Sequence, residues 1–321
     1  MDTLFEEIGK IGVVPVVKID DPKKAVPLAA ALAAGGIPCA EITFRTDAGE
    51  ESIRRIHQEM PDVLLGAGTV LTKSQVDKAV SAGARFIVSP GFNPKIVAYC
   101  AEKGVPIVPG CANPSDIEQA LEAGLNVVKF FPAEQAGGLD YIKAISAPYS
   151  GLKFMPTGGI SAANIAKYTA FDKILACGGS WMVSPELINN DAFDDISALC
   201  RQALFSMLGF SLAHIGINSG SEAEALKNAQ LFETLFGFGL RATSKSFFAG
   251  DSIEVMNKKG PGTQGHIGIG TWSVPKAAAY LERRGIALDP ASAQYDPNGN
   301  LQFIYLKDEI LQFAVHLSKR K

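Results

Sequence analysis

A strand-like run followed by a helical segment recurs through the first two thirds of the chain. From Val13 to about Leu204, each β-rich run leads into a polar turn and then a segment rich in Ala, Lys and Glu. Strands that alternate with helices indicate parallel pairing through crossover connections. The eight runs are VVPVVKI (13–19), CAEITFRT (39–46), LLGAGTV (64–70), ARFIVSP (84–90), VPIVPGCA (105–112), NVVKFFPAE (126–134), LKFMPTGG (152–159) and KILACGGSW (173–181). We therefore predict an α/β fold, a (β/α)8 TIM barrel, with an open doubly wound sheet as the alternative.

A different pattern occupies the last third of the chain, where a short segment occurs twice. AHIGIN (213–218) matches GHIGIG (265–270), and a helical segment follows each copy. Each copy then ends in a strand-like run, SIEVM (252–256) or ILQFAV (310–315). An internal repeat indicates two copies of one supersecondary unit. We predict a smaller α+β domain of two βαβββ halves, with the domains at residues 1–207 and 208–321.

Composition and charge exclude several classes of protein. The net charge is −3 and no basic run occurs, which argues against nucleic-acid binding. No stretch approaches eighteen apolar residues, so we expect no membrane-spanning helix. The start, MDTLFEEIGK, is acidic and polar, unlike a secretory signal. Five scattered cysteines without CxxC spacing predict reduced core thiols. We expect a cytoplasmic protein that acts on a small molecule.

Lys129 lies in the middle of the apolar run VVKFF. Desolvation penalises a buried ammonium group, which favours the neutral amine. A neutral amine is the form that attacks a ketone. The alternative is a lysine whose head reaches the barrel mouth or pairs with a carboxylate.

The second predicted strand carries three polar residues at alternate positions. Glu41, Thr43 and Arg45 alternate with the apolar Ile42 and Phe44, so the polar side chains share one face. In a barrel that face points into the lumen. A buried glutamate beside an amine can move protons, and an arginine can bind a substrate carboxylate through two hydrogen bonds. A purely structural ion pair between Glu41 and Arg45 is the alternative.

Glycine pairs end the last two predicted strands, in the segments 157–159 and 178–180. Glycines let backbone N–H groups approach an anion, and barrels often bind phosphate at this place. Turns also use such pairs. Thr69 and Pro90, at the ends of the third and fourth strands, complete a ring of residues around the amine.

The segments EITFRT, GAGTVL, SPGFNP, VVKFFPAE, PTGGIS and GGSWMV follow one another along the chain. With them, residues 1–205 resemble the 2-keto-3-deoxy-6-phosphogluconate and 4-hydroxy-2-oxoglutarate aldolase family. The resemblance implies a homotrimeric class I aldolase that needs no cofactor and releases pyruvate with glyceraldehyde 3-phosphate or glyoxylate. It implies Lys129 as the Schiff-base lysine and Glu41 as the general acid/base. The other implied residues are Arg45, Thr43, Thr69, Pro90, Phe131 and Thr157 for the substrate, and Gly158, Gly159, Gly179 and Ser180 for phosphate. The less familiar segment PGCANPSD leaves the substrate preference open.

Residues 211–318 resemble the vicinal oxygen chelate fold of glyoxalases and bleomycin-resistance proteins. The resemblance implies one metal ligand on the first and one on the last strand of each half, at His214, Glu254, His266 and Gln312. Such ligands favour Zn, Ni, Fe or Co. The alternatives are a domain that has lost its metal, or histidines held in ordinary hydrogen bonds. His57 and His316 have no such surroundings in the sequence, and we expect them at the surface.

Three functions are compatible with these patterns. The first is an aldolase with an accessory or regulatory C-terminal domain. The second is a bifunctional enzyme whose C-terminal domain performs metal-assisted isomerase or lyase chemistry. The third is a non-catalytic barrel that senses an anion. Lys129 together with Glu41 and Arg45 favours an enzyme over a sensor.

Overall fold

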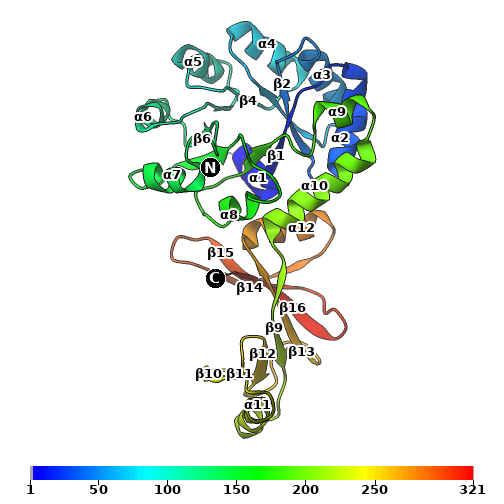
Figure 1. Ribbon diagram of the computed structural model, residues 1–321, viewed down its shortest axis with the longest axis vertical. Coiled ribbons are helices and arrows are strands. Elements are labelled where there is room, and N and C mark those ends of the chain that lie inside the picture. The colour runs from blue at the N-terminus through cyan, green and yellow to red at the C-terminus, as the bar shows by residue number, and fades with distance from the viewer. Residues whose placement is uncertain (1–2, 321) are drawn as a thin grey trace. The chain divides into compact units, whose positions relative to one another are not determined.

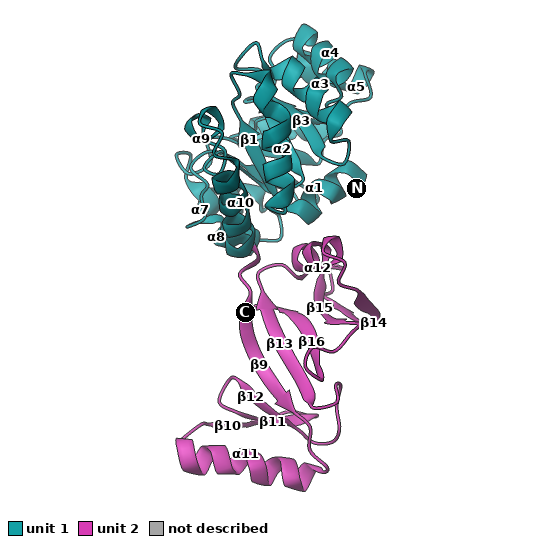
Figure 2. Cartoon of the chain, turned by 90° about the vertical axis from the view of Figure 1, so that its right-hand side faces the viewer, with its two compact units in different colours: residues 1–207 teal, residues 208–321 magenta. Residues whose placement is uncertain are grey.

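The computed structural model describes residues 3–320. The chain divides into two compact units, Met1–Met207 and Leu208–Lys321 (Figure 1 and Figure 2). No helix among the described residues is long and apolar enough to cross a membrane. All five cysteines are buried thiols, which confirms the prediction of reduced core residues.

The first unit contains eight short parallel strands, one within each predicted run (Figure 1). They are β1 (Val13–Val17), β2 (Cys39–Thr43), β3 (Leu64–Gly68), β4 (Phe86–Val88), β5 (Ile107–Val108), β6 (Val127–Phe130), β7 (Lys153–Pro156) and β8 (Cys177–Gly179). The helices are α1 (Thr3–Ile11), the 3-10 helix η1 (Pro22–Lys24), α2 (Ala25–Ala34), α3 (Gly49–Glu59), α4 (Lys73–Ala82), α5 (Pro94–Glu102), α6 (Pro114–Glu122), α7 (Gly138–Ser146), α8 (Ile165–Thr169), α9 (Pro185–Asn189) and α10 (Phe193–Leu208).

The strands close into a barrel rather than an open sheet. Six of them pair in the order β5-β4-β3-β2-β1-β8, and β6 pairs with β7. Parallel bridges join the remaining neighbours: Gly110 pairs with Lys129, and Thr157 pairs with Gly178. The prediction of a TIM-barrel fold is therefore confirmed, and the open-sheet alternative is wrong. Because the strands are parallel, their carboxyl ends share one rim.

Local sequence explains where the helices begin and end. Thr72 and Gln75 form a capping box at the start of α4, and Gly83 ends that helix in a left-handed conformation. Asn93 and Asn113 cap α5 and α6, and each precedes a proline at the first helical position. These capping residues determine where the helices begin and end. The loops between helices and strands are therefore short, and they hold the helices against the strands.

The second unit contains one eight-stranded sheet with two helices. Its two halves each run strand, helix and three strands, as predicted. Helix α11 packs on β10, β11 and β12, and α12 packs on β15 and β16 (Figure 2). The elements are β9 (Ser211–Ile217), α11 (Glu222–Phe236), β10 (Leu240–Ala242), β11 (Ser246–Ala249), β12 (Ile253–Met256), β13 (Gly265–Thr271), α12 (Val274–Arg283), β14 (Leu288–Tyr295), β15 (Leu301–Leu306) and β16 (Phe313–Lys319).

The two halves meet where β9 pairs antiparallel with β13, in the sheet order β10-β11-β12-β9-β13-β16-β15-β14. The last strand begins later than predicted, at Phe313 rather than at Ile310. Leu311 and Gln312 have positive φ angles of 52° and 66°. The backbones of Ile310 and Phe313 hydrogen-bond to each other, so the four residues form a tight turn.

Candidate functional site

A lysine and a glutamate meet inside the barrel. Lys129 lies on β6 and Glu41 on β2, and both side chains are buried. The Lys129 Nζ atom lies 3.3 Å from Glu41 Oε1. Glu41 Oε2 is buried without a hydrogen-bond partner among the described residues. Only one oxygen of the Glu41 carboxylate is therefore hydrogen-bonded, and the other is available to a bound molecule.

Gly68 makes room for this carboxylate at the end of β3. A Cβ atom on Gly68 would lie 2.2 Å from Glu41 Oε1, well inside van der Waals contact. The glycine in GAGTV is thus required by the neighbouring strand and not only by its own backbone.

Arg45 and Thr43 are joined at the rim beside β2. Thr43 is fully buried, and its hydroxyl donates to the Val17 carbonyl at 2.7 Å. The same hydroxyl accepts from Arg45 Nε at 3.1 Å, while Arg45 is exposed. Thr43 therefore holds the Arg45 guanidinium in place, a link that the sequence alternation did not reveal.

Phe131 lies beside the amine, and two more predicted residues, Pro90 and Thr69, follow strands β4 and β3. The Phe131 ring centroid lies 5.4 Å from Lys129 Nζ, and this ring is 39% exposed. Pro90 is exposed at the end of β4. Thr69 follows β3 with a φ of +56°, a region that costs a β-branched residue about 1–3 kcal/mol. Such strain is typical of functional positions.

The predicted anion-binding residues lie at the ends of β7 and β8. Thr157 is buried, and a Cβ on Gly178 would lie 2.3 Å from its Oγ1. Gly158 and Gly159 have φ values of +100° and +76°, which other residues adopt only with strain. Ser180 is exposed directly after Gly179, which ends β8.

Glu134 supports the glycine pair and was missed in the sequence. Its backbone N–H donates to the Gly158 carbonyl at 3.1 Å. Its carboxylate accepts a hydrogen bond from Tyr168 and lies 3.2 Å from Lys167 Nζ. The signal was present as the glutamate of VVKFFPAE, four residues after the end of the strand of Lys129.

Three histidines and a glutamate converge in the second unit. The Nε2 atom of His214 lies 3.1 Å from that of His266 and 3.2 Å from that of His316. Glu254 Oε2 lies 3.1 Å from His266 Nε2 and 3.4 Å from His214 Nε2. The three histidines form a group with the spacing of metal ligands. Four donor atoms therefore face one small space.

Two glycines of the repeat make this convergence possible. A Cβ on Gly216 would lie 1.9 Å from the His266 ring. A Cβ on Gly268 would lie 2.6 Å from the ring of His214 and 2.9 Å from that of His316. Each copy of His-Ile-Gly therefore supplies one histidine of the cluster and, two residues later, a glycine that leaves room for a histidine of the neighbouring strand.

Two predictions about this group were wrong. His316, expected at the surface, is only 2% exposed and is part of the cluster. Gln312, expected as a ligand, is exposed, and its Oε1 accepts from Gln264 Nε2 at 3.1 Å. The cause is the turn at Leu311 and Gln312, which shifts the start of the strand. His57 is exposed, as predicted.

Burial and hydrogen bonding set the charge states in the cluster. Burial lowers the pKa of His214, and it lowers the pKa of His316 to about 3 with help from the neighbouring histidines. Burial alone would raise the pKa of Glu254, but hydrogen bonds with His266 and Ser246 hold it below its ordinary value. At neutral pH the two histidines are neutral and the glutamate is ionised, which are the forms that bind cations.

Neighbouring side chains orient the cluster. Ser246 Oγ donates to Glu254 Oε1 at 2.5 Å, which leaves Oε2 directed at the histidines. The Phe303 and Tyr305 rings lie 4.4 Å and 5.1 Å from the His316 ring, measured between centroids. The cluster thus has the supporting contacts that ordered ligands require.

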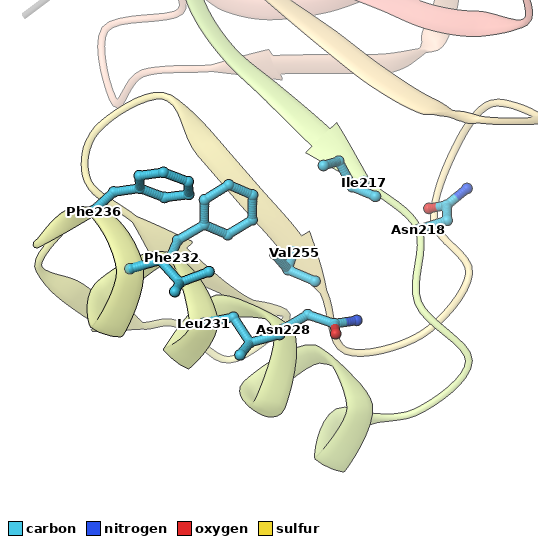
Figure 3. Close-up of a pocket in the computed structure, with 8 residues that line it drawn as sticks. Ile217, Asn218, Asn228, Leu231, Phe232, Phe236 and Val255 are labelled. Carbon is cyan, nitrogen blue, oxygen red and sulfur yellow. The ribbon is translucent and has the colours of Figure 1, made fainter.

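A separate apolar pocket of about 350 Å³ lies between α11 and the ends of β9 and β12 (Figure 3). Phe232 and Phe236 of α11 line it together with Ile217 and Val255. Because side chains alternate along a strand, Val255 and Glu254 point to opposite faces of the sheet. The pocket therefore does not belong to the histidine cluster.

A buried lysine beside a carboxylate, inside a closed parallel barrel, is the arrangement of an enzyme that acts through an amine nucleophile. Comparison with known proteins identifies the family. The model of the KDPG and KHG aldolases matches residues 5–199. The chain belongs to this family, and it is a class I carbon–carbon lyase.

Individual relatives resemble the same part of the chain. The 2-dehydro-3-deoxy-phosphogluconate aldolase of Treponema pallidum (strain Nichols) is 52% identical over 204 residues, which cover 64% of this chain and 97% of the relative. The KHG/KDPG aldolase of Escherichia coli (strain K12) is 40% identical over 192 residues, 60% and 90% of the two chains. The KDPG aldolase of Legionella pneumophila, solved with pyruvate as a covalent carbinolamine, superimposes with a TM-score of 0.60 at 38% identity, covering 62% and 97%.

Proposed function

We propose that the barrel cleaves 2-keto-3-deoxy-6-phosphogluconate to pyruvate and glyceraldehyde 3-phosphate, or 4-hydroxy-2-oxoglutarate to pyruvate and glyoxylate. The proposal rests on one observation, the buried Lys129 Nζ atom at 3.3 Å from Glu41 Oε1. The names of the relatives support the choice of substrates.

Lys129 is the proposed nucleophile. The neutral amine attacks the C2 carbonyl to give a carbinolamine, which loses water to form an iminium ion. Glu41 donates the proton that leaves with this water and then, as a carboxylate, accepts the proton of the C4 hydroxyl. The C3–C4 bond breaks, its electron pair passes to the iminium, and the aldehyde departs. The enamine then takes a proton at C3, and hydrolysis releases pyruvate and the free lysine.

The rim residues are proposed to hold the substrate during these steps. Arg45, oriented by Thr43, faces the carboxylate, because a guanidinium binds that group through paired hydrogen bonds. Thr69, Pro90, Phe131 and Thr157 enclose the pyruvate portion. The backbone N–H groups of Gly158, Gly159 and Gly179, with the Ser180 hydroxyl, bind the phosphate.

Borohydride trapping tests the nucleophile. Pyruvate with borohydride should give a stable adduct, and peptide mapping should place it on Lys129. Lys153→Ala is the control, because Lys153 Nζ is engaged with the Asp172 carbonyl at 2.7 Å. No adduct, or an adduct on another lysine, would end this assignment.

Ser180→Ala tests the phosphate site. The variant should have a higher KM for the phosphorylated substrate and an unchanged KM for 4-hydroxy-2-oxoglutarate.

For the second unit we propose a vicinal oxygen chelate domain that binds a divalent cation. The two βαβββ halves support the choice of fold, and the convergence of His214, His266 and Glu254 supports the cation. Imidazole-rich ligands favour Zn, Ni, Fe or Co over Mg or Ca. A bound cation would supply Lewis acidity, and these side chains would hold it. The domain is accessory or regulatory in this proposal, with metal-assisted isomerase or lyase activity as the alternative.

Elemental analysis tests the cation. The intact protein should retain close to one equivalent of metal after desalting, and His214→Ala/His266→Ala should retain none. The double variant should keep full aldolase turnover. Equal metal content in the two proteins would contradict the proposed site.

A homotrimer in the cytoplasm completes the proposal, which rests on the resemblance to the aldolase family and on the five buried thiols. Light scattering coupled to size exclusion measures the mass, and a monomer at micromolar concentration would contradict the trimer.

A further inference from the structure

We infer that His316 is the fourth ligand of this metal centre, which makes it a site of three imidazoles and a single carboxylate. The inference rests on the cation binding proposed above for the second unit. His316, which is only 2% exposed at the centre of the sheet, takes the ligand position that the sequence had suggested for Gln312.

The register of the sheet makes His316 the counterpart of Glu254. In the first half, β12 pairs with β9 so that Glu254 lies opposite Gly216, two residues after His214. In the second half, β16 pairs with β13 so that His316 lies opposite Gly268, two residues after His266. Each half therefore presents a histidine, a glycine and one donor on the neighbouring strand. The donor is a carboxylate in one half and an imidazole in the other.

The distances suit a cation better than hydrogen bonds alone. Donors at about 2.0–2.1 Å from a tetrahedral Zn ion lie about 3.3 Å from each other. Four of the six donor separations lie between 3.1 Å, for the Nε2 atoms of His214 and His266, and 3.4 Å, for His214 Nε2 and Glu254 Oε2, and the three histidine atoms lie within 4.8 Å of one another. His214 Nε2 faces three such atoms, yet an imidazole nitrogen carries one proton at most. Hydrogen bonding therefore leaves nitrogen lone pairs opposed, and a shared cation would remove that conflict.

Gln312 lacks the geometry of a ligand. It lies in the turn before β16, exposed and with its side-chain oxygen bonded to Gln264. The strand that follows carries His316 to the cluster instead.

The four ligands also set the charge of the centre. A divalent cation with one carboxylate and three neutral imidazoles keeps a net charge of +1, whereas two carboxylates would cancel it.

Metal affinity of the full-length protein tests the ligand. The protein is stripped with a chelator, reloaded with Co²⁺, and titrated against a competing chromophoric chelator. We expect His316→Ala to weaken Co²⁺ binding by roughly a hundredfold or more and Gln312→Ala to leave it unchanged. His316→Gln, closer in size, guards against collapse of the site, and circular dichroism checks the fold of each variant.

A wild-type protein that binds no Co²⁺ overturns the proposed metal domain itself. If the wild-type protein binds Co²⁺ and folded His316→Ala and His316→Gln bind it equally well, only the inference about His316 is overturned.

Discussion

The barrel and the eight-stranded sheet both gather residues that are far apart in the sequence, but they do so differently. In the barrel, parallel strands deliver their carboxyl ends to one rim, so Glu41 and Lys129 meet although 88 residues separate them. In the sheet, the cluster forms near the middle of four neighbouring strands, and its position depends on register. A repeat places one histidine in each half, and β9 and β13 bring the two together.

This difference determines how large an error in the predicted position of a strand each site tolerates. A strand of the barrel can be misplaced by a residue or two in a prediction and still end at the correct rim. In the sheet, a shift of one residue moves a side chain to the opposite face. The first site is therefore defined by strand ends, and the second by pairing.

The largest expected effect tests whether the two sites are independent. Lys129→Ala removes the nucleophile, so retro-aldol turnover should fall about a thousandfold or more. Metal content of the second unit should stay at the wild-type value. A coupled-enzyme assay for pyruvate and elemental analysis of the same sample measure both quantities. Turnover near wild type would move the nucleophile to another lysine.

Glycine substitutions compare the crowding in the two sites. Gly68→Ala would push a methyl group against Glu41, and misplacement of a catalytic group by about 1 Å can cost a hundredfold in kcat. Gly268→Ala would push against the His214 and His316 rings and should weaken metal binding without changing turnover. Gly91→Ala is the control, because a Cβ there meets no atom within 4 Å. Unchanged kcat in Gly68→Ala would show that Glu41 can relocate freely.

Ser246→Ala tests how firmly the carboxylate of the cluster is held. Loss of the hydrogen bond to Glu254 Oε1 should weaken metal binding about tenfold, as for other residues that orient ligands. Chelator competition measures the change, and Ser252→Ala, at an exposed serine just before β12, is the matched control. An unchanged affinity would mean that the three histidines suffice.

Thr43→Val should have the smallest effect and separates orientation from chemistry. Without the hydroxyl, Arg45 loses one hydrogen bond, worth about 1 kcal/mol, so KM should rise about fivefold while kcat changes less. Steady-state kinetics measure both constants. Thr43→Ser keeps the hydroxyl and should restore KM; failure of this rescue would point to packing instead.

Periodicity allowed most of the barrel to be predicted from the sequence. Each strand lies within its predicted run, because alternating strand and helix patterns with Asn or Thr caps leave little choice of boundary. Lys129 stood out because its strand is otherwise apolar. Thr43 was placed on the correct face, but its bond to Arg45 depends on side-chain conformation, which strand alternation does not encode.

The sheet shows where sequence patterns fail. The identical copies of His-Ile-Gly drew attention to His214 and His266, and the resemblance to the vicinal oxygen chelate fold added Glu254. His316 was missed because ILQFAV looks like a continuous strand, whereas Leu311 and Gln312 adopt the left-handed region and turn the chain. Neither residue is a glycine, so composition gave no sign of the turn.

The pairing of β9 with β13 has a consequence for how the second unit unfolds. Each half packs its own helix, and the four donors are divided equally, His214 and Glu254 from one half and His266 and His316 from the other. A cation shared by them would act as a non-covalent crosslink between the halves. By linkage, free metal at a hundred times its Kd adds about 2.7 kcal/mol to the stability of this unit, while the barrel gains nothing. The fraction of the second unit that stays folded in a cell would then depend on the local concentration of free metal.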